Sequence, residues 1–261
     1  MASLNVLLHL GQHARRIWAI EGNTPSRYAV MNESDDSPGR GVAFLFDVDN
    51  TLLDNDRVAA DLQHHLVGAV GAAGAQDYWR IFEQLRSELG YADYLGALQR
   101  YRNEHPRAPH LVSVSDFLIN YPFAERLFPN ALKVIEHVGQ WGPAIILSDG
   151  DVVFQPLKIS RSGLANVVSG HVLIYVHKEQ ELDDVEQRYP AQHYVLVDDK
   201  LRILAAVKEF WGSRVTTVFV RQGHYATDPK IFASYPPADI SIGCIRDLLQ
   251  CRLPELLNSK P

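Results

Sequence analysis

The sequence predicts an α/β fold: a parallel sheet with helices on both faces and a long helical insertion after the first strand. Three observations support this prediction. The apolar run Val42–Phe46 has the length and composition of a buried strand. The stretch 56–128 has apolar residues at helical spacing and no convincing strand. From residue 129 onward, helices and strands alternate, which favours parallel pairing with right-handed crossovers.

The composition limits the classes of function that the chain can have. It contains 261 residues, 46% of them hydrophobic, so one large domain or two small ones can bury a substantial core. A net charge of −6 and the lack of a long basic run argue against a nucleic-acid partner. No apolar run reaches the roughly 18 residues of a membrane span, and the apolar start lacks the features of a signal peptide.

The two cysteines, Cys244 and Cys251, are seven positions apart in an expected helix. At the rise of a helix their backbones lie about 10 Å apart, which is too far for a disulfide. Free cysteines suit a reducing compartment. We therefore expect a cytoplasmic protein that contacts neither a membrane nor nucleic acid.

The elements before residue 129 can be placed in order. Residues 1–40 read as an N-terminal extension, with a short amphipathic helix at 4–20 and a linker after it. In the insertion, a glycine- and alanine-rich stretch at 71–74 is expected to end the first helix, and two prolines interrupt the pattern later. The helices expected in the insertion are 58–70, 78–89, 94–101 and 113–118.

The elements after residue 129 follow from short apolar runs, which indicate strands, and from helical periodicity between them. The expected strands are 144–147, 171–176, 193–197, 215–220 and a short one at 239–242. The expected helices are 130–141, 152–161, 178–188, 201–211 and one that begins at Ile245. The α/β core is thus expected to comprise 41–55 and 129–261, and the helical insertion 56–128.

The strand at Val42–Phe46 leads directly into two aspartates, Asp47 and Asp49. Ligands bind at the carboxyl ends of the strands in open α/β sheets. Strand geometry would keep both side chains on one face, where two carboxylates repel unless one takes a proton or a cation lies between them. The alternative is a solvated loop rich in Asp and Asn, which would leave the preceding apolar run without a core.

Other expected strands also lead into polar residues, which a parallel sheet brings to the same edge. They are Ser148, Asp149, Asp198, Asp199 and Lys178. A carboxylate can serve as a covalent nucleophile, and several together can hold a divalent cation. A lysine and a hydroxyl can bind phosphate oxygens. This set of groups suits phosphoryl transfer.

Four motifs in this order resemble those of the haloacid dehalogenase-like (HAD) hydrolase superfamily. They are D-V-D-N-T at 47–51, S-D-G at 148–150, Lys178, and V-D-D at 197–199. The resemblance covers roughly 42–220, including the insertion. It implies a Rossmann-like core, Mg²⁺ as cofactor, and a helical cap that closes over the site and excludes water.

The resemblance also implies a role for each matched residue. Asp47 would form an aspartyl-phosphate, and Asp49 would protonate the leaving oxygen and then activate water. The implied Mg²⁺ ligands are the Asp47 carboxylate, the Asp49 backbone carbonyl and Asp199, with Asp198 bound or nearby. The implied phosphate-binding residues are Val48, Thr51, Ser148, Asp149 and Lys178.

Several of these residues have alternative interpretations. Lys158 competes with Lys178, but it falls within an expected helix rather than at a strand end. Ser148 could instead cap the following helix. Asp54 and Asp56 are better explained as turn residues than as ligands. Four aromatic residues of the insertion are expected in its core rather than at the substrate: Tyr78, Trp79, Phe82 and Tyr94.

These expectations favour a Mg²⁺-dependent phosphatase that acts on a small phosphorylated metabolite enclosed between core and cap. Asp49 argues against a haloacid dehalogenase, because halide leaves without a proton whereas an alcohol requires one. A phosphosugar mutase would use the same residues and return the phosphoryl group to the substrate. A non-catalytic binding module is disfavoured because every motif position is filled.

Overall fold

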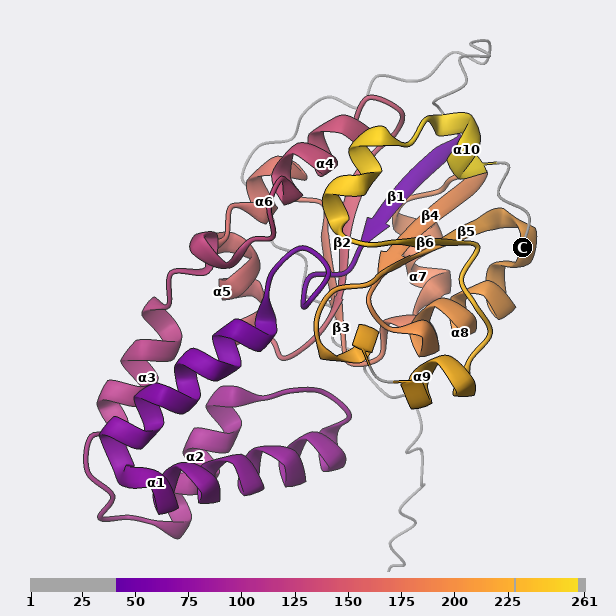
Figure 1. The fold of residues 1–261 in the computed structure, drawn as a ribbon. Coiled ribbons are helices and arrows are strands. Elements are labelled where there is room, and N and C mark those ends of the chain that lie inside the picture. The colour runs from indigo at the N-terminus through magenta and orange to yellow at the C-terminus, as the bar shows by residue number, and fades with distance from the viewer. Residues whose placement is uncertain (1–40, 228, 258–261) are drawn as a thin grey trace, which may run out of the picture.

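The computed structural model describes residues 41–227 and 229–257, which form an α/β core with a helical lobe beside it (Figure 1). This architecture confirms the predicted fold class. The N-terminal extension and linker expected within 1–40 lie outside the described residues.

One six-stranded sheet lies at the centre of the core, in the order β3-β2-β1-β4-β5-β6. Every neighbouring pair in it is parallel, as predicted. The strands are β1 (Val42–Phe46), β2 (Ala144–Asp149), β3 (Val172–Tyr175), β4 (His193–Asp198), β5 (Val215–Val220) and β6 (Ile240–Ile242). The chain winds from β1 toward β3 on one side and continues from β4 on the other. The crevice between β1 and β4 is therefore the switch point at which such sheets bind ligands.

Alternate strand residues pack on opposite faces of the sheet. In β1, Val42, Phe44 and Phe46 join one apolar cluster, whereas Ala43 and Leu45 join the other. The first face is covered by α4 (Ala131–Val138), α5 (Phe154–Arg161), α6 (Leu164–Val167), η5 (Ile245–Gln250) and α10 (Leu253–Leu257). The second is covered by α7 (Leu182–Arg188) and α8 (Leu201–Trp211).

Short 3₁₀ helices account for most differences from the expected elements. The helix expected at 178–188 divides into η2 (Lys178–Gln180) and α7. The helix expected from Ile245 begins as the 3₁₀ helix η5, and both cysteines that flank it are free, as predicted. The remaining elements are η3 (Gly212–Arg214), η4 (His224–Thr227) and α9 (Pro229–Ser234).

The insertion consists of α1 (Asn55–Leu89), α2 (Tyr94–Glu104), α3 (Leu111–Asn120) and η1 (Phe123–Arg126). Gly71 kinks α1 with a φ of 78° and a ψ of 168°, so the break expected at 71–74 is present but does not separate two helices with a loop. The bend folds the two arms of α1 into one lobe, drawn in indigo and purple in Figure 1.

The two connections between the core and the insertion pair with each other. Leu53 and Leu127 form an antiparallel bridge, and the backbone N–H of Asp54 donates to the carbonyl of Arg126 at 2.8 Å. Phe128 N–H donates to the carbonyl of Leu52 at 2.9 Å. This short ladder fixes where the insertion begins relative to the end of β1.

The loop after β5 packs on the turn that carries the first motif. The side chain of Gln222 donates to the carbonyl of Thr51 at 3.0 Å and accepts from the N–H of Ile245 at 2.7 Å. The next residue, Gly223, has a φ of +70°, and a Cβ added there would lie 2.5 Å from Cβ of Asn50. This position requires glycine both for its backbone conformation and for the close approach.

We predict that Gly223→Ala lowers both the melting temperature and the catalytic activity, because it strains the backbone and displaces Asn50. Gly170→Ala is the matched control, since Gly170 has a φ of +80° with nothing within 4 Å of the added Cβ. The free energy of unfolding of the control should fall by about 1 kcal/mol, the cost of the left-handed backbone conformation alone. Thermal unfolding of the two variants measures the difference, and equal losses would show that the approach to Asn50 is unimportant.

Candidate active site

A buried ion pair lies at the carboxyl edge of the sheet. Asp47, the residue after β1, is 2% exposed, and its Oδ1 lies 2.6 Å from Nζ of Lys178. The same Nζ lies 2.6 Å from Oδ2 of Asp198, at the end of β4, and donates to the carbonyl of Leu147 at 3.2 Å. Thr51 donates its hydroxyl to Oδ2 of Asp47 at 3.2 Å. Lys178 therefore bridges the ends of the two strands that flank the switch point.

Three carboxylates converge at this edge. Asp47, Asp198 and Asp199 are buried and each offers an oxygen within 4.8 Å of the others. Both carboxylate oxygens of Asp199 are buried and have no hydrogen-bond partner among the described residues. Buried carboxylates without partners are costly, and oxygen ligands of this type suit Mg²⁺. The residues present thus fit the divalent cation that the sequence implies.

The electrostatics of the site follow from burial and neighbouring charges. Burial would raise the pKa of Asp47, but the ammonium groups of Lys178 and Lys200 outweigh it and hold that pKa below its usual value. Burial raises the pKa of Asp198 to about 6, against the attraction of Lys178. Burial also raises the pKa of Asp199, opposed by Lys200 and reinforced by Asp198. Negative charge is therefore in excess at this edge.

The carboxylate of Asp49 lies apart from the three-carboxylate cluster. Its Oδ1 is 2.6 Å from Nζ of Lys158, on α5, and its side chain is 25% exposed. The expectation that Asp47 and Asp49 share one strand face is wrong, because the chain leaves strand geometry after Phe46. The carbonyl of Val48 closes a turn by accepting from the N–H groups of three following residues, Thr51, Leu52 and Leu53. Asp49 therefore faces a different partner from Asp47.

Ser148 and Asp149 lie beside the ion pair. Ser148 is buried and accepts a hydrogen bond from the side chain of Gln155 at 2.9 Å. It does not cap α5, because Asp151 accepts from the first N–H groups of that helix instead. Asp149 accepts from the backbone N–H of Lys178 at 2.7 Å, and burial raises its pKa. Asp149 thus holds the backbone of the lysine that pairs with Asp47.

The structure places two further lysines at the site. Lys158, which the sequence argument set aside in favour of Lys178, is 1% exposed and contacts Asp49. Its signal in the sequence is its spacing of three from Gln155, which puts both side chains on the same face of α5. Lys200 directly follows Asp199, and its ammonium lies 5.6 Å from the ring centroid of Tyr225. Among the described residues, that ammonium has no carboxylate or hydrogen-bond partner.

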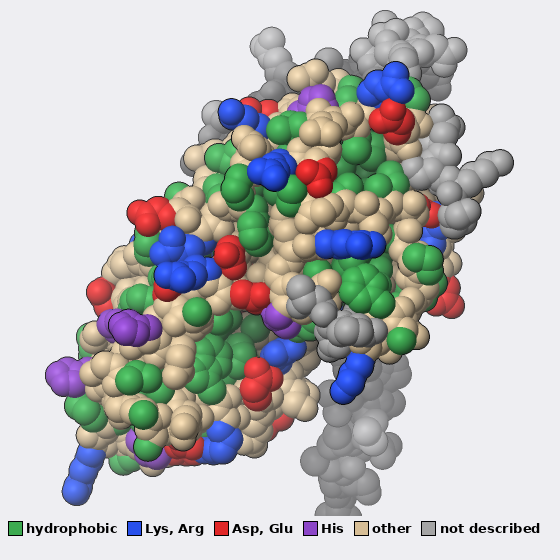
Figure 2. Space-filling view, viewed as in Figure 1, with side chains coloured by type: hydrophobic (Ala, Val, Ile, Leu, Met, Phe, Trp, Pro, Cys, Tyr) green, Lys and Arg blue, Asp and Glu red, His purple; other side chains and the backbone are tan. Residues whose placement is uncertain are grey.

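A cavity of about 540 Å³ separates the insertion from this edge of the core. Charged and histidine side chains gather along the junction of the two lobes in Figure 2. The core contributes Asp49, Lys158 and Lys200 to the lining, and the insertion contributes Trp79, Phe82, Arg86 and Tyr94. The volume and the mixed lining are typical of a site for a small organic ligand.

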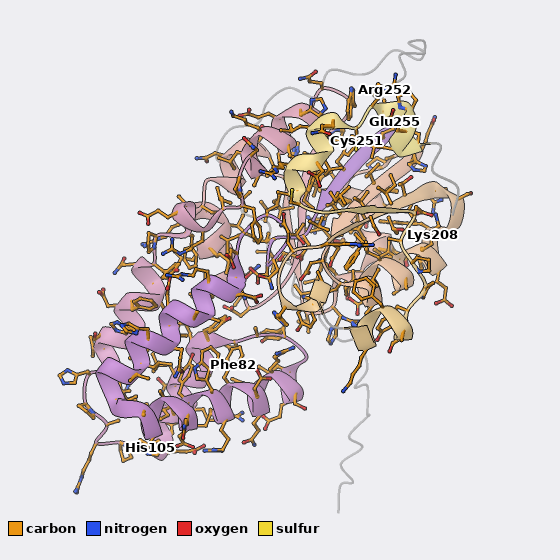
Figure 3. The ribbon with its side chains drawn as sticks, viewed as in Figure 1. Phe82, His105, Lys208, Cys251, Arg252 and Glu255 are labelled. Carbon is orange, nitrogen blue, oxygen red and sulfur yellow. The ribbon has the colours of Figure 1, made fainter. Side chains whose placement is uncertain are left out.

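Three of the four aromatic residues assigned to the core of the insertion also line this cavity: Trp79, Phe82 and Tyr94. The expectation that these residues lie in the core is confirmed for Phe82 and Tyr94, which are buried in the apolar cluster, and Trp79 packs against that cluster. The rings of Phe82 and Tyr94 lie 4.7 Å apart, and that of Tyr94 lies 5.3 Å from Phe154 of α5. Figure 3 labels Phe82 within the insertion. Tyr78 is buried and donates its hydroxyl to the carbonyl of Tyr94.

Asp54 and Asp56 have structural contacts. Asp54 caps α1 by accepting from the N–H of Arg57 at 2.9 Å. Asp56 accepts from the side chain of Asn50 at 3.0 Å and from the N–H of His224 at 2.8 Å. Neither belongs to the three-carboxylate cluster, in agreement with the expectation that they are not ligands, but Asp56 lies in the first turn of α1 rather than in a turn before it. In the part of the chain that the structure describes, no helix has the length and hydrophobicity to cross a bilayer.

Comparison with known proteins identifies the family. No family model and no curated protein matches the chain. The crystal structure of a haloacid dehalogenase-like hydrolase from Burkholderia xenovorans LB400 is 62% identical over 82% of this chain and 99% of that one, with a TM-score of 0.79. The chain belongs to the haloacid dehalogenase-like hydrolases.

More distant HAD-like structures share the fold. An L-2-haloacid dehalogenase from Xanthobacter autotrophicus is 18% identical over 80% of this chain and 96% of that one, with a TM-score of 0.54. The HAD-hydrolase YfnB from Bacillus subtilis, described as bound to magnesium, is 18% identical over 84% and 99%, with a TM-score of 0.53. At this identity the likeness extends to the fold of the HAD-like core and cap alone.

The three-carboxylate cluster of this HAD-like hydrolase should make its thermal stability depend on Mg²⁺. Mg²⁺ should raise the melting temperature of the chelator-treated protein, since it binds the folded cluster. Asp199→Asn should abolish this rise and should raise the melting temperature without metal, because burial disfavours the ionised form of the Asp199 carboxyl and raises its pKa. Differential scanning fluorimetry with and without MgCl₂ measures both effects.

Asp183→Asn, at an exposed position of α7, is the matched control and should retain the full rise with Mg²⁺. A wild-type melting temperature that is insensitive to Mg²⁺ would contradict a cation site at the cluster.

Proposed function

We propose that this HAD-like hydrolase is a Mg²⁺-dependent phosphatase that hydrolyses a small phosphorylated metabolite through an aspartyl-phosphate on Asp47. The observation that supports this function most strongly is the placement of Asp49. Asp49 lies two residues after the proposed nucleophile Asp47, its side chain is 25% exposed, and it lines the cavity, where a leaving group would need a proton. A dehalogenase needs no proton donor there, because halide leaves as a stable anion, whereas an alcohol must be protonated as it leaves.

In the first half-reaction, the carboxylate of Asp47 forms a bond to phosphorus while the bond between phosphorus and the ester oxygen breaks. The electron pair of the broken bond stays on the ester oxygen. That oxygen takes the proton of Asp49, and the alcohol leaves. The products of this step are a phosphorylated Asp47 and an ionised Asp49, which is the state that the next step requires.

In the second half-reaction, water attacks the phosphorus and gives a proton to Asp49. The bond between phosphorus and the Asp47 oxygen breaks, and its electron pair returns to the carboxylate. Inorganic phosphate leaves, and both aspartates regain their starting protonation states. Asp49 thus serves as acid and then as base, for which one carboxylate with access to the cavity is sufficient.

The other residues neutralise and orient the phosphoryl group. Lys178 keeps Asp47 ionised, and Lys200 supplies a cation that faces the cavity. Bound Mg²⁺ would supply positive charge against the phosphoryl oxygens. Its proposed ligands are Asp47, Asp198, Asp199 and the backbone carbonyl of Asp49. The proposed phosphate contacts are Ser148, the turn at Val48 and Thr51, and the backbone beside Asp149.

We predict that the wild type releases inorganic phosphate from a generic aryl phosphate only when Mg²⁺ is present. Asp47→Asn should remove turnover, because the amide is a poor nucleophile. Asp49→Asn should lower turnover of an alkyl phosphate by about 10²- to 10⁴-fold, the usual contribution of a general acid. A phosphate-release assay over some tens of metabolites measures these rates and identifies the substrate class.

Product analysis separates the alternatives. A sugar phosphate that yields an isomer instead of inorganic phosphate would indicate a mutase. Release of chloride from a 2-chloro acid, with no phosphate release across the panel, would indicate a dehalogenase. Phosphate release that persists in excess chelator would remove the metal from the mechanism.

A further inference from the structure

We propose that Lys158 is a positioning residue: its buried ammonium, held between Asp49 and Asn55, fixes Asp49 for proton transfer to the leaving group. This inference rests on the phosphatase function proposed above. It concerns a lysine that lies outside the four HAD-like motifs and contacts the acid rather than the nucleophile.

The environment of Lys158 excludes an ordinary surface role. The residue is 1% exposed, although lysine is rarely buried without partners. Its Nζ lies 2.6 Å from Oδ1 of Asp49 and 2.9 Å from Oδ1 of Asn55. The ring of Phe154 lies 5.5 Å from the same ammonium. Burial of a charge at this cost is explained if the contact with Asp49 serves the reaction.

Among the described residues, Lys158 supplies the hydrogen bond that orients the carboxylate of Asp49. Asp49 sits on the turn after β1, and its side chain is partly open to the cavity. Lys158 holds one carboxylate oxygen, while no described residue donates to the other oxygen, Oδ2. An acid held at one oxygen presents the second in a defined direction, which reduces the orientational cost of reaching the transition state.

The second partner of Lys158 connects this acid to the insertion. Asn55 is the first residue of α1, and its side-chain amide donates to the hydroxyl of Tyr94 at 3.4 Å. Tyr94 in turn packs on Phe154, one turn before Lys158 on α5. The ammonium of Lys158 is therefore held by Asp49 of the core and by Asn55 of the insertion. The position of the Asp49 carboxylate therefore depends on contacts between the first turn of α1 and α5.

The test compares two substrates that differ in their need for a proton donor. 4-Nitrophenyl phosphate has a leaving group that departs with little protonation, whereas phenethyl phosphate releases an alkoxide that requires it. The value of kcat/KM reports the steps through departure of the leaving group, which are the steps that Asp49 assists as an acid. Lys158→Met keeps an unbranched apolar chain that is one heavy atom shorter, and it removes the charge.

We expect Lys158→Met to lower kcat/KM for phenethyl phosphate by about 10²-fold. The value for 4-nitrophenyl phosphate should change by a few-fold at most. Lys158→Arg, which keeps a cation, should restore part of the loss. An equal loss on both substrates, or no loss on either, would overturn the positioning role.

Lys208→Met is the matched control. Lys208 also pairs with an aspartate, Asp239 at 2.8 Å, but it lies on the side of the core away from the insertion (Figure 3). Its removal should leave the ratio of the two kcat/KM values unchanged. If Lys158→Met does not fold, Asn55→Ala offers a second test, because it removes the other hydrogen-bond partner of the Lys158 ammonium. Asn55 is half-buried, and its loss should shift the ratio of the two kcat/KM values in the same direction.

The outcomes separate this inference from the proposed function. Wild-type protein that hydrolyses neither ester, nor any phosphate ester of the wider panel, rejects the phosphatase. Wild-type activity with an unchanged ratio in Lys158→Met and Asn55→Ala rejects only the role of Lys158.

Discussion

The repulsion among three buried carboxylates at one sheet edge is the constraint on which the rest of the site depends. Asp47, Asp198 and Asp199 meet there because β1 and β4 are neighbours at the switch point of a parallel sheet. Lys178 reaches them from the end of β3 and balances part of their charge. The remainder can be relieved by a proton, as the raised pKa values of Asp198 and Asp199 indicate, or by a cation, and a cation is also what a phosphoryl group requires. The excess charge and the proposed chemistry are therefore two aspects of one arrangement.

The fold supports this arrangement by confining the charge to the ends of apolar strands. The interiors of β1, β2 and β4 are buried on both faces, so these strands can place charged residues at the edge without loss of the sheet. The insertion adds an aromatic wall on the opposite side of the cavity. Its first helix starts two residues beyond Leu53, within the short ladder that joins the lobes, so the cap and Asp49 are positioned by the same few residues.

Local pattern predicts much of this structure, because strand ends and helix periods are properties of short segments. Asp47, Lys178, Asp198 and Asp199 are all identifiable as residues that follow apolar runs, and the sheet brings them together. The orientation of Asp49 is not predictable in this way, because it depends on a turn that abandons strand geometry and on a lysine more than a hundred residues away.

The same limit applies to the residues that line the cavity. The rings of Trp79 and Phe82 pack within the insertion, and they line a cavity only because the core lies opposite them.

The most direct test of phosphoryl transfer through Asp47 is mass spectrometry of the acid-quenched enzyme during turnover of an aryl phosphate with Mg²⁺. We expect one added phosphoryl group on the peptide that contains Asp47, and none after chelation. Phosphate release without this adduct, or an adduct on another residue, would contradict phosphoryl transfer through Asp47.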